Sequence, residues 1–100
     1  MKIHTEAIQF KADQKLIDYI DRKLGKMEVF FDRVLSTRVV LKLENSGKIK
    51  GKVVEARLNV PGDCLIARAV STTFEAAIDQ VKDVLARQLI RYKDKNEKGS

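Results

Sequence analysis

The side chains best suited to do chemistry in this chain are its cations. Lysine and arginine number 20 against 14 aspartates and glutamates, which gives a net charge of +6. Such an excess favours a polyanionic partner such as RNA, DNA or an acidic membrane. A merely soluble surface can carry the same balance, so the placement of the charges has to decide between these interpretations.

The groups that catalysis or metal binding would need are scarce. The chain has one histidine, His4, and one cysteine, Cys64. A lone histidine near the start is more simply a strand residue, and a lone cysteine on a strand is a small, inert side chain. No glycine-rich phosphate loop and no His or Cys pair at metal-ligand spacing occurs. We therefore expect no enzyme, no cofactor and no small-molecule substrate.

The setting follows from the same inventory. A single thiol makes no internal disulfide, which fits a reducing cytoplasm. The first ten residues lack the apolar run of a signal peptide, and no stretch approaches the 18 or so apolar residues of a membrane span. These features favour a cytoplasmic location and argue against a membrane partner.

The clearest charge pattern lies near the C-terminal end. Four cations recur at spacings of four, four and three residues, so they form one column if the segment is helical; they are Arg87, Arg91, Lys95 and Lys98. Lys82 and Lys93 fall elsewhere on the polar surface of the same helix. Cations in a last turn also stabilise a helix by complementing its dipole, but this does not explain a column that begins at Arg87.

A second charge pattern lies between residues 15 and 32. On a helix, one side of the apolar stripe would carry Lys15, Tyr19, Arg22 and Lys26, and the other side Asp18, Asp21, Glu28 and Asp32. Such segregation suggests that one flank meets an anion, where Tyr19 could stack on a base. Chance remains an alternative, because eight groups on a short helix can separate by accident.

Apolar periodicity predicts the elements that carry these charges. Residues 2–8 alternate weakly as a strand. A helix is expected to begin after Asp13, a good N-cap, with Leu16, Ile20, Leu24, Met27 and Phe31 as its core stripe. A second helix is expected after Thr72, with Glu75 completing a capping box and with Phe74, Ile78, Val81, Leu85, Leu89 and Tyr92 as its stripe.

Three further strands are expected between the helices, at 36–44, 52–60 and 64–70, with turns at 45–48 and 61–63. The inward residues would be Val39, Leu41 and Leu43, then Val54, Ala56, Leu58 and Val60, then Leu65, Ala67 and Ala69. The outer face would carry mixed charges: Arg38, Lys42, Lys52, Arg57 and Arg68 with Glu44 and Glu55.

The predicted fold is therefore a single α+β domain over residues 1–100 with the order β-α-β-β-β-α. Two helices with one apolar face each are most simply packed on one face of a four-stranded sheet. The second helix, of about 22 residues, would span about 33 Å, against about 26 Å for a strand of eight. Its basic end, about residues 93–100, should project past the sheet.

Two stretches resemble a known family. Residues 30–44, FFDRVLSTRVVLKLE, and residues 76–95, AAIDQVKDVLARQLIRYKDK, are similar to the short ribosome hibernation-promoting factors, relatives of ribosome-associated inhibitor A. The similarity covers nearly the whole chain, and the second stretch is the specific one. The tail NEKGS and Tyr92 depart from the usual pattern.

The resemblance implies a fold similar to double-stranded RNA-binding domains and binding to the small ribosomal subunit and its 16S rRNA, in the channel for messenger and transfer RNA. Members inhibit translation in stationary phase, and many promote inactive ribosome dimers. The matching rRNA-binding positions would be Lys23, Lys26, Arg87, Arg91, Lys93 and Lys95, with Lys15, Tyr19, Arg22, Lys82 and Lys98 as weaker candidates. The alternatives are a general duplex-RNA binder and a protein-interaction module that uses the open sheet face.

Overall fold

The chain forms one sheet and one layer of helices. The computed structural model describes residues 2–46 and 49–98, with side chains described except at 30, 45–46, 49–50 and 96–98. The elements are β1 (Lys2–Ala7), α1 (Gln14–Gly25), α2 (Met27–Phe30), β2 (Ser36–Ser46), β3 (Ile49–Val60), β4 (Asp63–Ser71) and α3 (Phe74–Lys98). The predicted β-α-β-β-β-α order is confirmed, with the one-turn α2 added. Of the turn expected at 45–48, Gly47 and Lys48 lie outside the described residues.

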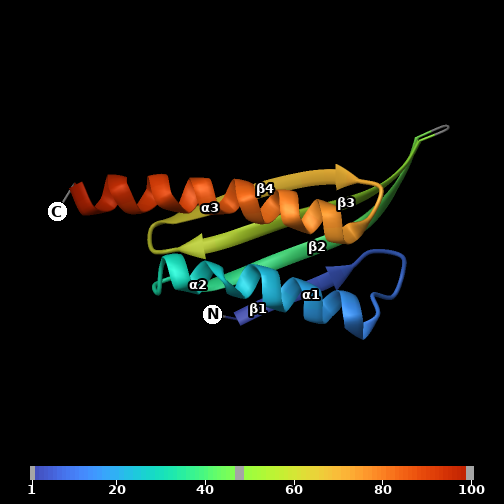
Figure 1. The fold of residues 1–100 in the computed structure, drawn as a ribbon, viewed down its shortest axis with the longest axis horizontal. Coiled ribbons are helices and arrows are strands. Elements are labelled where there is room, and N and C mark those ends of the chain that lie inside the picture. The colour runs from blue at the N-terminus through green and yellow to red at the C-terminus, as the bar shows by residue number, and fades with distance from the viewer. Residues whose placement is uncertain (1, 47–48, 99–100) are drawn as a thin grey trace.

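The sheet has the order β1-β2-β3-β4. β1 runs parallel to β2, whereas β2, β3 and β4 are antiparallel neighbours. The helices cover one face, with α1 packed on β1 and α3 on β3 and β4 (Figure 1). β1 and β4 are the edge strands, and none of the described helices packs on the opposite face of the sheet.

One hydrophobic core fills the space between helices and sheet. Almost all predicted inward residues are buried in it; among those fully shielded from solvent are Ile20, Leu24, Val39, Leu41, Val54, Ala56, Leu58, Ile78, Val81, Leu85 and Leu89. The apolar residues of the strands, which recur every two residues, pack against those of the helices, which recur every 3.6 residues, because each element has a single apolar face. The core thus determines which sides of α1 and α3 face solvent and are available to a partner.

The first helix begins where the sequence predicts it and ends earlier. The Asp13 side chain accepts a hydrogen bond of 2.9 Å from the Leu16 N–H, as expected of an N-cap. The prediction of one continuous helix to Phe31 is wrong, because α1 ends at Gly25 and α2 starts at Met27. Glycine disfavours a helix interior, which explains the break at this point. Met27 and Phe31 are nevertheless buried, so the stripe itself is correct.

The start of α3 differs by one residue from the prediction. The Ala76 N–H donates to Thr73 Oγ1 at 3.1 Å, and the Ala77 N–H donates to the Thr73 carbonyl at 3.2 Å. Thr73 is therefore the N-cap and Thr72 is not. Glu75 becomes the second helical residue, where its charge still faces the positive end of the helix dipole.

Two residues near the β2–β3 hairpin lie differently from the prediction. Leu43, expected inside, is 50% exposed, because its end of β2 runs beyond the helices (Figure 1). Lys52, its partner across the strands, was expected on the outer face but lies on the helix side. Its ammonium sits 5.3 Å from the centre of the Phe74 ring, which also stacks on Phe10 at 5.2 Å.

Helix α3 is long enough to leave the sheet behind. It spans 25 residues, and its C-terminal turns extend past the β3–β4 turn (Figure 1). The predicted projection of the basic end is confirmed, and residues 93–98 are part of the helix rather than a separate tail.

Candidate nucleic-acid interface

The first charged region is the seam between α1 and α3, which run side by side in the same direction (Figure 1). Asp79 of α3 ties the two helices together. It accepts a hydrogen bond of 2.8 Å from the Tyr19 hydroxyl, and the Lys23 ammonium lies 3.8 Å from the same carboxylate oxygen. The sequence interpretation missed Asp79, whose partners are 56 and 60 residues away in the chain.

Tyr19 is the aromatic centre of this seam. Partial burial raises the pKa of its hydroxyl, and the hydrogen bond to Asp79 and the negative charges of Asp79 and Glu75 raise it further, against a smaller lowering by Arg22. The Arg22 guanidinium and the Lys23 ammonium each lie 5.4 Å from the ring centre. The phenol is therefore protonated and fixed in place, and its ring makes cation–π contacts with two side chains.

Four lysines lie on this flank of the helical layer, from the Asp79 contact toward the C-terminal end of α3, and we call them the inter-helix lysines: Lys23, Lys26, Lys82 and Lys93. Lys26 follows Lys23 by three residues and Lys82 follows Asp79 by three, so on parallel helices they lie at the same level on the facing sides. Lys93 returns to the flank of Lys82 after eleven residues, or three turns. Lys26 is exposed, whereas Lys23, Lys82 and Lys93 are half-buried.

The second charged region is the opposite flank of α3, which we call the outer column: Arg87, Arg91 and Lys95. All three side chains are exposed, and none forms an ion pair with a described residue. Four-residue spacing puts them on one side of the helix, as the sequence predicts. The side chain of Lys98, the fourth expected member, lies outside the described residues.

A third group surrounds the start of α1. Lys15, Tyr19 and Arg22 line one hollow of about 520 Å³, together with Asp13, Leu16, Asp18 and Glu75. The prediction that Asp18 lies on the opposite flank is wrong, because its carboxylate shares this hollow with the cations. Mixed charges make this end a less favourable anion site than the other two regions.

Of the other acids predicted on this flank, Asp21 of α1 and Glu28 of α2 lie where they were expected, whereas Asp32 lies in the turn after α2 and not on a helix. Asp21 and Glu28 face β1, where they line a separate hollow with Lys2, Ile3 and Gly25. The negative charges are thus turned toward the sheet edge. Lys23 and Lys26 lie on the other side of α1, which faces α3.

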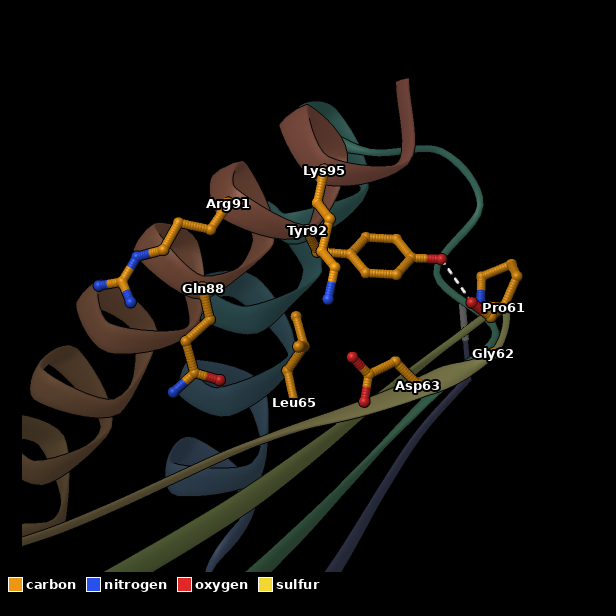
Figure 2. A pocket seen from close by; sticks show the side chains of 8 residues that line it. All are labelled: Pro61, Gly62, Asp63, Leu65, Gln88, Arg91, Tyr92 and Lys95. Carbon is orange, nitrogen blue, oxygen red and sulfur yellow. Dashed lines mark hydrogen bonds between the residues drawn. The ribbon is translucent and has the colours of Figure 1, made fainter. Parts of the chain in front are cut away.

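A pocket of about 390 Å³ lies where the outer column passes the β3–β4 turn (Figure 2). It is lined by Pro61, Gly62, Asp63, Leu65, Gln88, Arg91, Tyr92 and Lys95. The Tyr92 hydroxyl donates to the Pro61 carbonyl at 2.5 Å, which ties the helix to the turn. Sequence analysis missed this pocket because its walls come from segments about 30 residues apart.

The arrangement of the possible catalytic groups speaks against a Cys–His dyad. His4 lies on β1 and Cys64 on β4, the two edge strands, with two strands between them. At about 4.8 Å per strand spacing, the sheet alone separates them by roughly 14 Å or more. Within residues 2–46 and 49–98, no three His, Cys, Asp or Glu side chains gather as a metal site would require. No helix among the described residues is both long and apolar enough to span a membrane.

Comparison with known proteins gives a consistent result. Residues 3–97 match a family model described as "Sigma 54 modulation protein / S30EA ribosomal protein". Proteins called ribosome hibernation promoting factor are similar to the chain. One from Klebsiella oxytoca is 41% identical over 95% of this chain and 96% of its own length. Another from Azotobacter vinelandii is 37% identical over 95% of this chain and 85% of its own.

Solved structures agree with these similarities. The N-terminal domain of Protein Y from Thermus thermophilus superposes with a TM-score of 0.80 at 27% identity, covering 92% of this chain and 99% of that one. A ribosomal subunit interface protein from Coxiella burnetii gives a TM-score of 0.82 over 94% of this chain and 99% of its own. At 22% identity, the second likeness concerns the fold alone.

Proposed function

Because the chain belongs to the family described as Sigma 54 modulation protein / S30EA ribosomal protein, we propose that it is a ribosome hibernation factor. It binds the small ribosomal subunit and its 16S rRNA in the channel for messenger and transfer RNA. Its relatives from Klebsiella oxytoca and Azotobacter vinelandii carry the name ribosome hibernation promoting factor, which supports this proposal.

The observation that carries the proposal is the outer column on a projecting helix. Arg87, Arg91 and Lys95 are exposed and form no ion pair with any described residue, so they can offer their charge to phosphate. Arginine and lysine contact phosphates without reading sequence, and folded RNA is recognised largely by shape. A helix that extends past its sheet reaches into a groove that the body of the domain cannot enter.

The inter-helix lysines form the second part of the proposed contact. Lys23, Lys26, Lys82 and Lys93 lie on the same helical layer as the outer column, so one RNA surface can meet both groups. Inhibition then needs no catalysis, because a domain seated in the channel excludes messenger and transfer RNA by its volume. The protein acts where ribosomes are, in the cytoplasm.

Sedimentation tests this proposal directly. A stationary-phase lysate is separated on a sucrose gradient and each fraction is probed for the protein. We expect co-migration with small subunits and with particles that contain them. Presence only at the top of the gradient would contradict the proposal.

A binding comparison separates the alternatives. The purified protein is presented with intact small subunits and, in a filter assay, with duplex RNA of random sequence. A hibernation factor prefers the subunit, whereas a general duplex binder retains both equally. A partner that remains bound after nuclease treatment would favour a protein-interaction module on the open sheet face.

A further inference from the structure

The pocket beside the outer column has the construction of a ligand site. It opens between α3 and the β3–β4 turn, and polar groups from both segments line it (Figure 2). Its volume of about 390 Å³ falls within the range of about 300–1,000 Å³ of small-molecule sites. The proposed phosphate contacts use only Arg91 and Lys95 of its lining, so the remaining groups have no assigned role.

The pocket keeps opposite charges apart. Asp63 lies at the turn, whereas Arg91 and Lys95 lie on the helix, and neither cation is within ion-pair distance of the Asp63 carboxylate. One carboxylate oxygen accepts a 2.7 Å hydrogen bond from the Cys64 N–H, and the other has no partner among the described residues. A ligand that satisfies both sides has hydrogen-bond donors at one end and an anionic group at the other.

Two apolar side chains, Leu65 and Tyr92, line the pocket between these charges. Leu65 forms the floor and the Tyr92 ring forms the upper wall in Figure 2. The Tyr92 ring meets Phe31 edge-on at 5.5 Å, and its hydroxyl is held by the Pro61 carbonyl. The Gln88 amide nitrogen donates to the Ile66 carbonyl at 3.0 Å, which holds that side chain at the rim. Contacts within the protein therefore hold the lining side chains in place without a ligand.

We propose that this pocket binds one unpaired guanine nucleotide. The phosphate lies against Arg91 and Lys95, the base packs over Leu65 beside Tyr92, and Asp63 accepts from the Watson–Crick edge. Guanine presents two adjacent donors on that edge, which a carboxylate accepts together. Adenine, cytosine and uracil each place an acceptor beside their donor, and that acceptor would face the Asp63 charge.

The inference rests on the proposed function for the source of the nucleotide, since an unpaired guanine in ribosomal RNA would reach the pocket along the outer column. A free guanine nucleotide has the same chemistry. A peptide also carries an ammonium and a carboxylate, but its backbone lacks an apolar ring that could pack over Leu65. The net charge of +6 also favours the polyanion.

Amide chemical-shift titration of the isolated full chain tests the pocket. The ligands are the pentanucleotides UUGUU and UUAUU and the mononucleotide GMP. We expect UUGUU to shift the amides of Gly62, Asp63 and Leu65 and to bind at least about fivefold more tightly than UUAUU, as one two-donor contact allows. Saturation by GMP at lower concentrations than by UUGUU would assign the free nucleotide as the ligand. Equal binding of both pentanucleotides, or shifts confined to the α1–α3 seam, would overturn the proposal.

A pair of matched variants removes the effect of net charge. Asp63→Asn makes the protein more positive, so non-specific RNA binding should tighten, yet the preference for UUGUU should disappear. Asp83→Asn makes the same charge change at an exposed position of α3 outside the pocket, and the preference should remain. Loss of the preference in both variants, or in neither, refutes the role of Asp63.

Co-sedimentation with small subunits is measured for the same proteins. A parent protein that binds subunits but shows no guanine preference refutes the pocket alone. A parent protein that shows the preference but does not bind subunits refutes the proposed function and leaves the pocket intact. The two hypotheses therefore fail separately.

Discussion

The α1–α3 seam and the outer column are both basic, but they use their charges differently. In the seam, Lys23 is bound to Asp79 and its side chain is 27% exposed. In the outer column, Arg87, Arg91 and Lys95 project from α3 without an ion-pair partner among the described residues. Lysine and arginine therefore have two roles: in the seam a lysine joins the helices, and in the outer column the cations remain available to an external anion.

The cause of the difference is the position of one acid. Asp79 lies on the flank of α3 that faces α1, where it accepts from Tyr19 and attracts Lys23. No described helix lies beside the outer flank, where Arg91 and Lys95 line the pocket at the β3–β4 turn together with Asp63. A phosphate approaching the seam competes with Asp79, whereas one approaching the column does not. The column should consequently contribute more to RNA binding, and the seam more to stability.

The largest expected effect comes from a change in the hydrophobic core beneath α3, the helix that belongs to both regions. Leu85 is fully buried on the core face of α3, so Leu85→Ala should lower the free energy of unfolding by about 2–5 kcal/mol. Urea denaturation followed by circular dichroism measures it. Arg87→Ala, two residues further along the same helix, is the control and should change stability by less than about 0.5 kcal/mol. Similar losses in both variants would show that the faces of α3 are misassigned.

Charge reversal in each region should separate binding from stability. Arg91→Glu removes one charged contact, worth roughly 1.5–3 kcal/mol, so affinity for the small subunit should fall by about tenfold or more. The melting temperature should not change, because Arg91 is exposed. Lys23→Glu should weaken binding less but lower the melting temperature, since it places a second carboxylate beside Asp79.

Asp21→Asn is the control for position in this experiment. Asp21 faces β1, away from both basic regions, so its loss should leave subunit affinity nearly unchanged. If Asp21→Asn weakens binding more than Arg91→Glu does, the proposed interface lies on the wrong side of the molecule.

Salt dependence sharpens the comparison further. With about five phosphate contacts, the logarithm of affinity should fall against the logarithm of salt concentration with a slope of order −4. Arg87→Gln with Arg91→Gln should make this slope shallower by about 2, because two counterion-releasing contacts are lost. Lys23→Gln with Asp79→Asn leaves the net charge unchanged and should alter the slope by less than about 1. Equal changes in the two double variants would remove the distinction between the regions.

Local patterns in the sequence were sufficient for most of the fold. Asp13 as a cap, the inward residues of β3 and β4 and the stripe of α3 each depend on a few neighbouring residues, and all are confirmed. The errors occur where tertiary structure decides. Leu43 has an inward pattern but lies beyond the helices, and Lys52 fits an outward pattern but packs on Phe74.

The candidate site also has a part that local sequence patterns predict and a part that depends on tertiary structure. The outer column depends only on the four-residue spacing along one helix, so the sequence predicts its geometry. The Tyr19–Asp79 bond and the pocket around Asp63 join residues 60 and about 30 positions apart, and no local pattern specifies such pairs. Both needed the packing of α1 and α3 against the sheet before they could be recognised.

The smallest expected effect tests the seam by itself. Tyr19→Phe keeps the ring but removes the hydroxyl that donates to Asp79, so it should cost about 0.5–1.5 kcal/mol of stability at neutral pH. Subunit affinity should change little, because the cations of the outer column are untouched. Urea denaturation and co-sedimentation give the two measurements.

The pH dependence of the difference in stability between the parent and this variant tests the Tyr19–Asp79 hydrogen bond. Folding raises the pKa of the Tyr19 hydroxyl above its ordinary value of 10.0, because partial burial and Asp79 disfavour the phenolate. The folded state therefore holds this proton more tightly than the unfolded state does. The resulting stability is fully present below pH 10.0 and is lost as the pH rises through the folded pKa. Other titrating groups are common to parent and variant, so their difference in unfolding free energy isolates Tyr19. That difference should shrink as the pH rises above 10.0, and a difference that stays constant would show that Asp79 does not hold the hydroxyl.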